Sequence, residues 1–264
     1  DKQLKESTIY IRVVSASNLN LSKWLLMDQA YFETVGANYR IFNLLALGAL
    51  FGIMLFSLGL GATLKNINYF YYSAYILSCI LILMTLDGNG FYWLWPNNPT
   101  FNLAALPLFT FCIAYFRLLS IYGFLEIQTL SSTLGRIARY WIAFLTVLLL
   151  GSLAGFFNLL DPIFIALVWV CSIVFGLFLI VFAIIKKAPL ARSIFFVFII
   201  PLLGSILQAL SVIGLVDLGA AVTLLAKAMV LLHALLFSIV IAHKISIEER
   251  GAQDAQHDDL TGLE

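Results

Sequence analysis

The sequence predicts an all-α membrane protein: a seven-transmembrane helix bundle, with a short N-terminal β remnant of an extracytoplasmic domain. Of its 264 residues, 62% are hydrophobic and 11% are charged, whereas soluble domains carry about 25% charged residues. The mean hydropathy is +1.00, and the apolar residues gather in stretches of about 20, the length that crosses a bilayer core. The net charge of +1 indicates neither nucleic acid nor an acidic substrate as a partner.

Seven apolar stretches give the predicted spans, and several are separated by very short loops. The turn at Asp161 and Pro162 separates the fourth from the fifth, and Asp217 with its neighbours separates the sixth from the seventh. Short connections join antiparallel neighbours in a helix bundle. We therefore expect one membrane domain over residues 38–243. Its predicted spans are 41–62, 68–86, 101–122, 138–160, 162–185, 193–216 and 219–243.

Lys and Arg are concentrated in the loops on one side of the predicted bundle. The opposite loops, at 87–100, 161 and 217, contain none, and Arg40 at the far end of the first span is the single exception. Basic loops stay on the cytoplasmic side of a membrane, so the C-terminus is expected to be cytoplasmic and the N-terminus outside. The basic loop residues are Lys65, Arg136, Arg139, Lys186, Lys187, Arg192, Lys244 and Arg250.

Residues 1–37 differ from the rest and are predicted to be the C-terminal strands of an extracytoplasmic β domain. STIYIRVV (7–14) alternates apolar and polar residues as a half-buried strand does, and WLLMDQAYFE (24–33) could be a second strand. Two strands cannot bury a face alone, so a larger β domain is expected to precede them. The alternative is an amphipathic leader. Since the chain has neither an initiator Met nor a signal peptide, we expect it to be processed or excised.

The C-terminal residues are polar, unlike the spans before them. HKISIEERGAQDAQ (243–256) permits a helix broken at Gly251, so residues 244–256 are predicted to extend the seventh helix as a cytoplasmic signalling stalk. AQHDDLTGLE (255–264) resembles the opening of a GGDEF diguanylate cyclase domain, A-x-x-D-x-L-T-G-L-x-N-R, which would start at 257. The alternative is a disordered tail with a turn at Thr261. The matching residues are Ala255, Asp258, Leu260, Thr261, Gly262 and Leu263.

Four segments of the membrane domain carry a second resemblance. They are GALFGIMLF, NINYFYYSAYIL, GNGFYWLWPNNP and IVIAHKI. Over about residues 38–250 the chain is similar to bacterial seven-transmembrane receptors with diverse intracellular signalling modules. In two places it departs from that family: Phe56 and Ser57 stand where Tyr-Asn is expected, and His233 stands where relatives tend to carry glutamate.

This second resemblance implies a protein of the bacterial inner membrane, with a periplasmic N-terminus and a cytoplasmic C-terminus. A β sandwich would precede the bundle and a cyclase or kinase would follow it. Together with the GGDEF opening, it implies a homodimeric transducer that couples an extracytoplasmic small molecule or lipid signal to cyclic di-GMP synthesis. GTP and Mg²⁺ would bind the downstream domain, and no cofactor is expected in this chain. The alternative is a seven-helix transporter or a membrane protein that binds a hydrophobic ligand.

Charged residues within the spans are the candidate site residues, because each costs at least about 2.5 kcal/mol at the centre of a membrane helix. Lys227 could join an outward-facing polar site with Asp87, Asp161 or Asp217, or it could extend its ammonium group to the outer surface. A retinal Schiff base at Lys227 would need a carboxylate counter-ion, and the third span contains none.

Two further residues of the spans can be charged. Arg117, near the inner end of the third span, is expected to reach the surface or to pair with Glu126. His233 is expected to be a hydrogen-bonded packing residue, although a pH-sensing role stays open. No catalytic constellation is visible, no metal-ligand spacing occurs, and the three cysteines lie in apolar runs. Any catalysis by the parent protein would therefore lie outside these residues.

Overall fold

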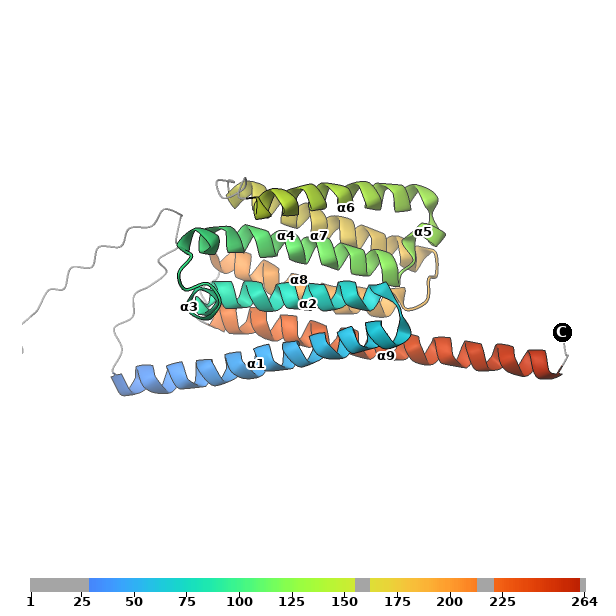
Figure 1. Cartoon of the computed structure of the whole chain (residues 1–264), viewed down its shortest axis with the longest axis horizontal. Helices are drawn as coiled ribbons and strands as arrows, with labels where there is room; N and C mark the ends of the chain where they lie inside the picture. The colour runs from blue at the N-terminus through green and yellow to red at the C-terminus, as the bar shows by residue number, and fades with distance from the viewer. Residues whose placement is uncertain (1–28, 155–161, 213–220, 262–264) are drawn as a thin grey trace, which may run out of the picture.

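The computed structural model describes residues 29–154, 162–212 and 221–261, and every regular element in them is a helix. Figure 1 shows long helices packed side by side into a bundle, with short helices at its ends. The short ones are α3 (Asn89–Trp93) and α5 (Ile127–Leu130). The long ones are α1 (Gln29–Leu64), α2 (Ile67–Leu86), α4 (Pro99–Phe124), α6 (Ser132–Leu153), α7 (Pro162–Ile185), α8 (Ala191–Val212) and α9 (Ala221–Thr261).

The helix starts follow from polar residues in the turns. The side chain of Asn66 accepts a hydrogen bond from the backbone N–H of Asn68 at 3.0 Å, and so caps α2. Asn98 caps α4 in the same way through Phe101 at 3.0 Å, and Ser131 caps α6. Such caps satisfy the backbone donors that a helix start leaves unpaired. These polar residues therefore divide a nearly continuous apolar sequence into separate helices.

Two helices form the centre of the bundle. In its most apolar stretch, α4 has 67% of its residues buried and α2 has 50%, whereas α6 has only 22%. α2 packs against α1 and α4, α4 against α6 and α7, and α8 between α7 and α9, which closes against α1. Leucine and isoleucine side chains on the outer helices are exposed, for example Leu44 at 71% and Ile163 at 73%. This exposed apolar surface suits contact with lipid acyl chains.

Six helices are long and apolar enough to cross a membrane, and they correspond to the predicted spans one to five and seven. The predicted sixth span, 193–216, falls on α8, whose apolar part within the described residues is the shorter Ala191–Gly204. Residues 213–220 lie outside the described ranges. The protein is an integral membrane protein by length and composition of its helices, and the seventh crossing stays a prediction.

The structure differs from the sequence prediction at both ends of the membrane domain. Residues 29–33, expected to end a second β strand, belong to α1. Extending a helix costs less than nucleating a new element, and no proline interrupts the chain from Gln29 to Leu64. The strand predicted at 7–14 lies outside the described residues. At the other end, α9 continues through Gly251, where a break was expected, because one glycine costs a helix only about 1 kcal/mol.

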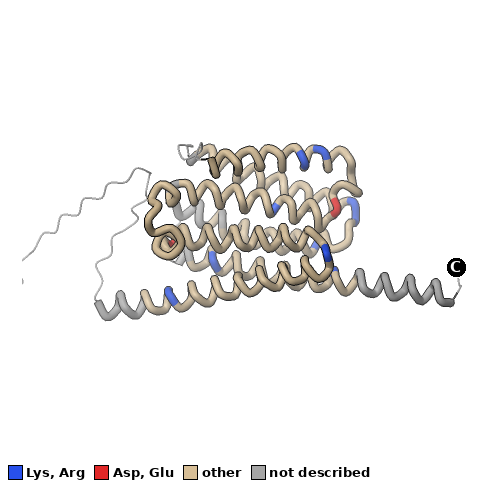
Figure 2. Tube along the Cα trace, in the orientation of Figure 1, with Lys and Arg blue, Asp and Glu red and all other residues tan. Residues whose placement is uncertain are grey.

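Basic residues gather at one end of the bundle, the end from which α9 projects (Figure 2). We call it the basic end. Helix ends from across the sequence meet here, since α1 and α7 finish and α6 and α8 begin at this end. The opposite end contains α3. The described residues that define the basic end are Lys65, Arg136, Arg139, Lys186, Lys187, Arg192 and Lys244.

Candidate functional site

Near the end of the bundle opposite the basic end, Lys227 of α9 holds together three helices. Its ammonium nitrogen lies 2.6 Å and 2.8 Å from the two carboxylate oxygens of Asp87, which caps the C-terminus of α2. It also lies 2.8 Å from the hydroxyl of Tyr39 and 2.8 Å from the amide oxygen of Asn43, both on α1. The Tyr39 hydroxyl donates in turn to Asp87 at 3.1 Å. We call these four residues the Lys227 cluster.

The Lys227 cluster is removed from solvent and internally satisfied. The Lys227 and Asp87 side chains are 3% and 5% exposed. An ammonium group has three donors, and the cluster offers it a carboxylate, a hydroxyl and an amide oxygen. Lys227 therefore does not extend its ammonium group to the outer surface, which was the alternative prediction. Of the three proposed partners, Asp87 is in contact, while Asp161 and Asp217 lie outside the described residues.

Sequence reasoning missed Tyr39 and Asn43. They lie one helical turn apart on α1, so both face α9, and Asn43 is 6% exposed. The only signal in the sequence was Asn43 itself, an asparagine at the start of an apolar stretch. Such a residue indicates a polar partner, but the partner can be identified only when the neighbouring helix is known. The cluster can bind α1, α2 and α9 to one another, and it has no group placed for catalysis.

His233 is completely buried farther along α9. Its Nδ1 lies 3.0 Å from the backbone carbonyl oxygen of Val197 on α8, to which Nδ1–H donates. The rings of Tyr75, Phe198 and Phe237 surround it at 4.9–6.0 Å. This environment is that of a packing histidine that ties α9 to α8. The pH-sensing role stays a prediction.

Arg117 does not form the predicted pair with Glu126. Its guanidinium lies 4.8 Å from the centre of the Trp169 ring on α7. Glu126 instead lies 3.8 Å from Lys244 of α9, with its own side chain 65% exposed. Arg117 lies seven residues before the last residue of α4, Phe124, and Glu126 follows the end of this helix, so the two α-carbons differ by about 10 Å in height at ~1.5 Å per residue. This places them at different depths, with Glu126 at the basic end and Arg117 inside the bundle.

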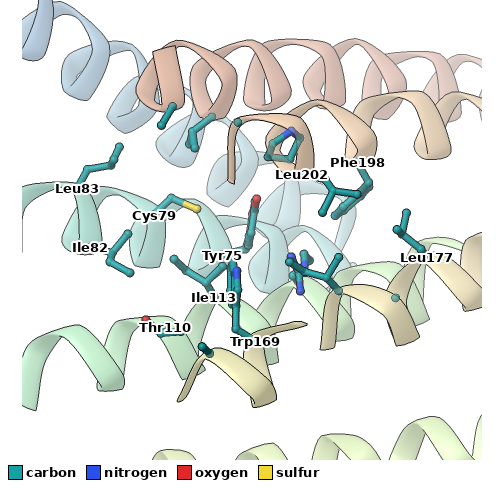
Figure 3. Close-up of a pocket in the computed structure, with 18 of the residues that line it drawn as sticks. Tyr75, Cys79, Ile82, Leu83, Thr110, Ile113, Trp169, Leu177, Phe198 and Leu202 are labelled. Carbon is teal, nitrogen blue, oxygen red and sulfur yellow. The ribbon is translucent and has the colours of Figure 1, made fainter. Parts of the chain in front are cut away.

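Arg117 lines a cavity of about 540 Å³ between α2, α4, α7, α8 and α9. Figure 3 shows Tyr75 and Cys79 of α2, Ile113 of α4 and Trp169 of α7 on its walls. The remaining lining residues are almost all aliphatic or aromatic. The Nη2 atom of Arg117 is buried and finds no hydrogen-bond partner among the described residues. Sequence patterns could not reveal this cavity, because five helices far apart in the chain form it.

No group of three or more potential metal ligands occurs within the described residues. The two arrangements that stand out are therefore the closed Lys227 cluster and the open cavity at Arg117. Both lie within the part of the chain that matches a known family: a family model described as 7TM diverse intracellular signalling covers residues 39–244. No curated protein and no solved structure matches the chain.

Proposed function

Because this chain belongs to the 7TM diverse intracellular signalling family, we propose that it is the input module of a transducer that controls a cytoplasmic diguanylate cyclase. Membership of this family makes it a membrane receptor for intracellular signalling. The proposal adds the direction of the signal, from the outside to the cytoplasm, and the output, cyclic di-GMP. The GGDEF-like residues from 255 onward, which begin in the last part of α9, support that output, and the basic end supports a cytoplasmic C-terminus.

The continuity of α9 carries the proposal. This helix runs from Ala221 to Thr261 without a break, a length of about 60 Å at ~1.5 Å per residue. It begins beside the Lys227 cluster, crosses the bundle and projects well beyond the basic end (Figure 1). A single continuous helix thus joins the end of the bundle opposite the basic end, which we propose to be extracytoplasmic, to the residues that resemble the cyclase opening. Four of these, Ala255, Asp258, Leu260 and Thr261, lie in α9 itself, while Gly262 and Leu263 lie outside the described residues.

In the proposed mechanism, an extracytoplasmic small molecule or a lipid shifts the bundle between two arrangements. The Lys227 cluster fixes the outer part of α9 against α1 and α2, so a change there rotates or slides α9 as a unit. At the cytoplasmic side, this motion would change how two cyclase domains of a homodimer face each other. GTP and Mg²⁺ would bind those domains, outside this chain. Coupling of this kind requires two states that the signal stabilises differently.

The transporter alternative has less support. Transporters of known architecture place broken helices at the centre of the membrane, where half-helix ends bind the solute. The membrane-crossing stretches of α1, α2, α4, α6, α7 and α9 are each continuous within the described residues, although Pro107 lies inside α4. Continuous helices favour a device that transmits motion along a helix over one that opens a path for solute.

Disulfide crosslinking of the stalk tests the coupling. Ala252→Cys would be introduced into the full-length parent protein with Cys79, Cys112 and Cys171 replaced by alanine. In membranes, we expect the double variant Asp87→Leu/Lys227→Leu, which frees α9 without leaving a buried charge, to change the rate of crosslinking severalfold. Tyr92→Leu, an exposed change on α3 at the same end, is the matched control and should leave the rate unchanged. Equal rates in the parent and the double variant would contradict coupling through α9.

Nucleotide synthesis tests the output separately. Membranes that contain the full-length parent protein are expected to convert GTP to cyclic di-GMP in the presence of Mg²⁺. If no cyclic di-GMP forms while crosslinking still responds to the double variant, the cyclase is removed from the proposal and the receptor remains.

A further inference from the structure

We propose that the cavity at Arg117 is a binding site for a single-chain amphiphile with an anionic head group, of the fatty-acid class. The guanidinium of Arg117 would hold the head group, and the apolar part of the cavity would hold the chain. This inference rests on the proposed receptor function, because it identifies the kind of signal that the bundle receives. It concerns residues that belong neither to the Lys227 cluster nor to the stalk.

The charge of Arg117 favours an anionic ligand. Two carboxylates of the described bundle are already paired with other cations: Asp87 with Lys227 and Glu126 with Lys244. The Arg117 guanidinium carbon lies 4.8 Å from the centre of the Trp169 ring, a contact that pairs its charge with no anion. Its Nη2 is buried without a hydrogen-bond partner among the described residues. A guanidinium edge matches a carboxylate in geometry, because two parallel N–H donors meet two oxygens.

The shape of the cavity favours a ligand with a single acyl chain. Along α4 the lining extends from Leu106 past Arg117 to Ile121, and the part from Arg117 to Leu106 is about 16 Å long at ~1.5 Å per residue. Apart from Thr110 and the polar tips of Tyr75 and Cys79, the walls along this length are apolar. The volume of about 540 Å³ lies in the range of ligand sites, roughly 300–1,000 Å³. A largely apolar space of this length with one cation fits one acyl chain and one anionic group.

The surrounding membrane limits which ligands would prefer the cavity to the bilayer. Lipid tails are as apolar as the walls of the cavity, so an acyl chain gains little by moving from one to the other. A neutral amphiphile therefore has no reason to prefer the cavity. An anion does, because Arg117 provides a charge-assisted hydrogen bond that the hydrocarbon lacks. Selectivity for the head group is thus the property that distinguishes a binding site from a space filled by any lipid.

A ligand bound in this cavity would contact α9, the helix that continues into the stalk. Ala226 and Val230 of α9 form one wall together with Phe198 and Pro201 of α8, and Trp169 of α7 lies on another. A bound chain would hold these walls apart, and its departure would let them approach. The ligand therefore has a direct mechanical route to α9.

Quenching of tryptophan fluorescence by brominated amphiphiles tests the site. The whole chain, in nanodiscs of phosphatidylcholine, would be titrated with bromododecanoic acid and with the corresponding bromododecanol. The quenching that Trp169→Phe removes reports on the cavity. We expect this component to saturate with the acid and to be displaced by unlabelled dodecanoic acid, while the alcohol gives at least about tenfold weaker binding.

Variants separate the charge from the fold. Arg117→Gln is expected to weaken binding of the acid about tenfold or more. Arg117→Lys should weaken it less, because lysine keeps the charge but loses the two parallel donors, and Arg139→Gln, at an exposed arginine of the basic end, should change nothing. Thr110→Phe, which shortens the apolar part but leaves Arg117, should weaken dodecanoate more than octanoate. Thermal unfolding of each variant shows that it is folded.

Two results would overturn the proposal: equal quenching of Trp169 by the alcohol and the acid, or unchanged binding of the acid by Arg117→Gln. Either would mean that any acyl chain fills the cavity and that Arg117 merely stacks on Trp169. These measurements need no cyclase domain and no stalk. They can therefore fail while crosslinking at Ala252 still supports the receptor mechanism, or succeed while it fails.

Discussion

Lys227 and Arg117 are both cations inside the helix bundle, but their surroundings differ. Lys227 is enclosed by a carboxylate, a hydroxyl and an amide oxygen within 2.8 Å. Arg117 faces a tryptophan ring and a cavity, and its Nη2 has no partner among the described residues. A satisfied cation joins the elements that satisfy it, whereas an unsatisfied cation beside an open space can accept a ligand. The comparison assigns a structural role to the first and a binding role to the second.

Removing the counter-charge of Lys227 is the strongest test of this contrast. Asp87→Ala leaves a buried ammonium without its carboxylate, and breaking a buried pair costs about 3–5 kcal/mol. We expect a correspondingly large loss of stability, measured as the midpoint of thermal unfolding in detergent micelles. The double variant Asp87→Leu/Lys227→Leu should recover most of it, because it removes both charges. Equal losses in the single and double variants would show that the charges themselves are not paired.

Tyr39→Phe is expected to have the next largest effect. The change removes a hydroxyl that accepts from Lys227 at 2.8 Å and donates to Asp87 at 3.1 Å. Leaving buried partners short of one hydrogen bond costs about 1–3 kcal/mol. Tyr92→Phe is the matched control, since Tyr92 is 70% exposed and should change the unfolding midpoint little. If both variants unfold alike, the hydroxyl of Tyr39 contributes nothing to the cluster.

The sequence predicted the general architecture well, because hydrophobic length is a local property. The ranges 68–86 and 162–185 agree with α2 and α7 almost to the residue. Local signals failed where two structures compete for the same residues. Residues 29–33 have apolar and aromatic side chains that suit a strand, yet they continue into α1.

The candidate sites were predicted only in part. Lys227 and Asp87 stood out because a charge in an apolar stretch is costly, and this cost is readable without a structure. Which of three aspartates meets Lys227 depends on how the helices pack, and so does the contact of Arg117 with Trp169. Tyr39, Asn43 and the cavity gave no separate signal, since each depends on helices brought together from distant parts of the chain. His233 was correctly interpreted as a packing residue with a hydrogen bond.

The variant Arg117→Met tests whether Arg117, unlike Lys227, is dispensable for stability. This variant loses the contact with the Trp169 ring, which is worth about 0.5–2 kcal/mol, but it also removes a buried group that lacks a full set of partners. We expect the two effects to offset each other, so that the unfolding midpoint changes little. The same substitution at Lys227, Lys227→Met, should be clearly destabilising, since it leaves Asp87 without its partner. If Arg117→Met destabilised as much as Lys227→Met, Arg117 would be a structural residue like Lys227.

Lys244 at the basic end is a third cation of the described bundle, and its ion pair is expected to contribute least to the free energy of unfolding. Its partner Glu126 is 65% exposed and lies 3.8 Å away, and such surface pairs contribute about 0–1 kcal/mol because water and salt screen them. Glu126→Gln should therefore lower the unfolding midpoint slightly at low salt and not at all at high salt. The same salt titration should leave the effect of Asp87→Ala unchanged, because the Lys227 cluster is closed to ions. A large, salt-independent effect of Glu126→Gln would mean that the basic end holds α9 as firmly as the opposite end does. In that case the bundle would have no end at which α9 moves freely, and a signal could not reach the stalk by a shift of this helix alone.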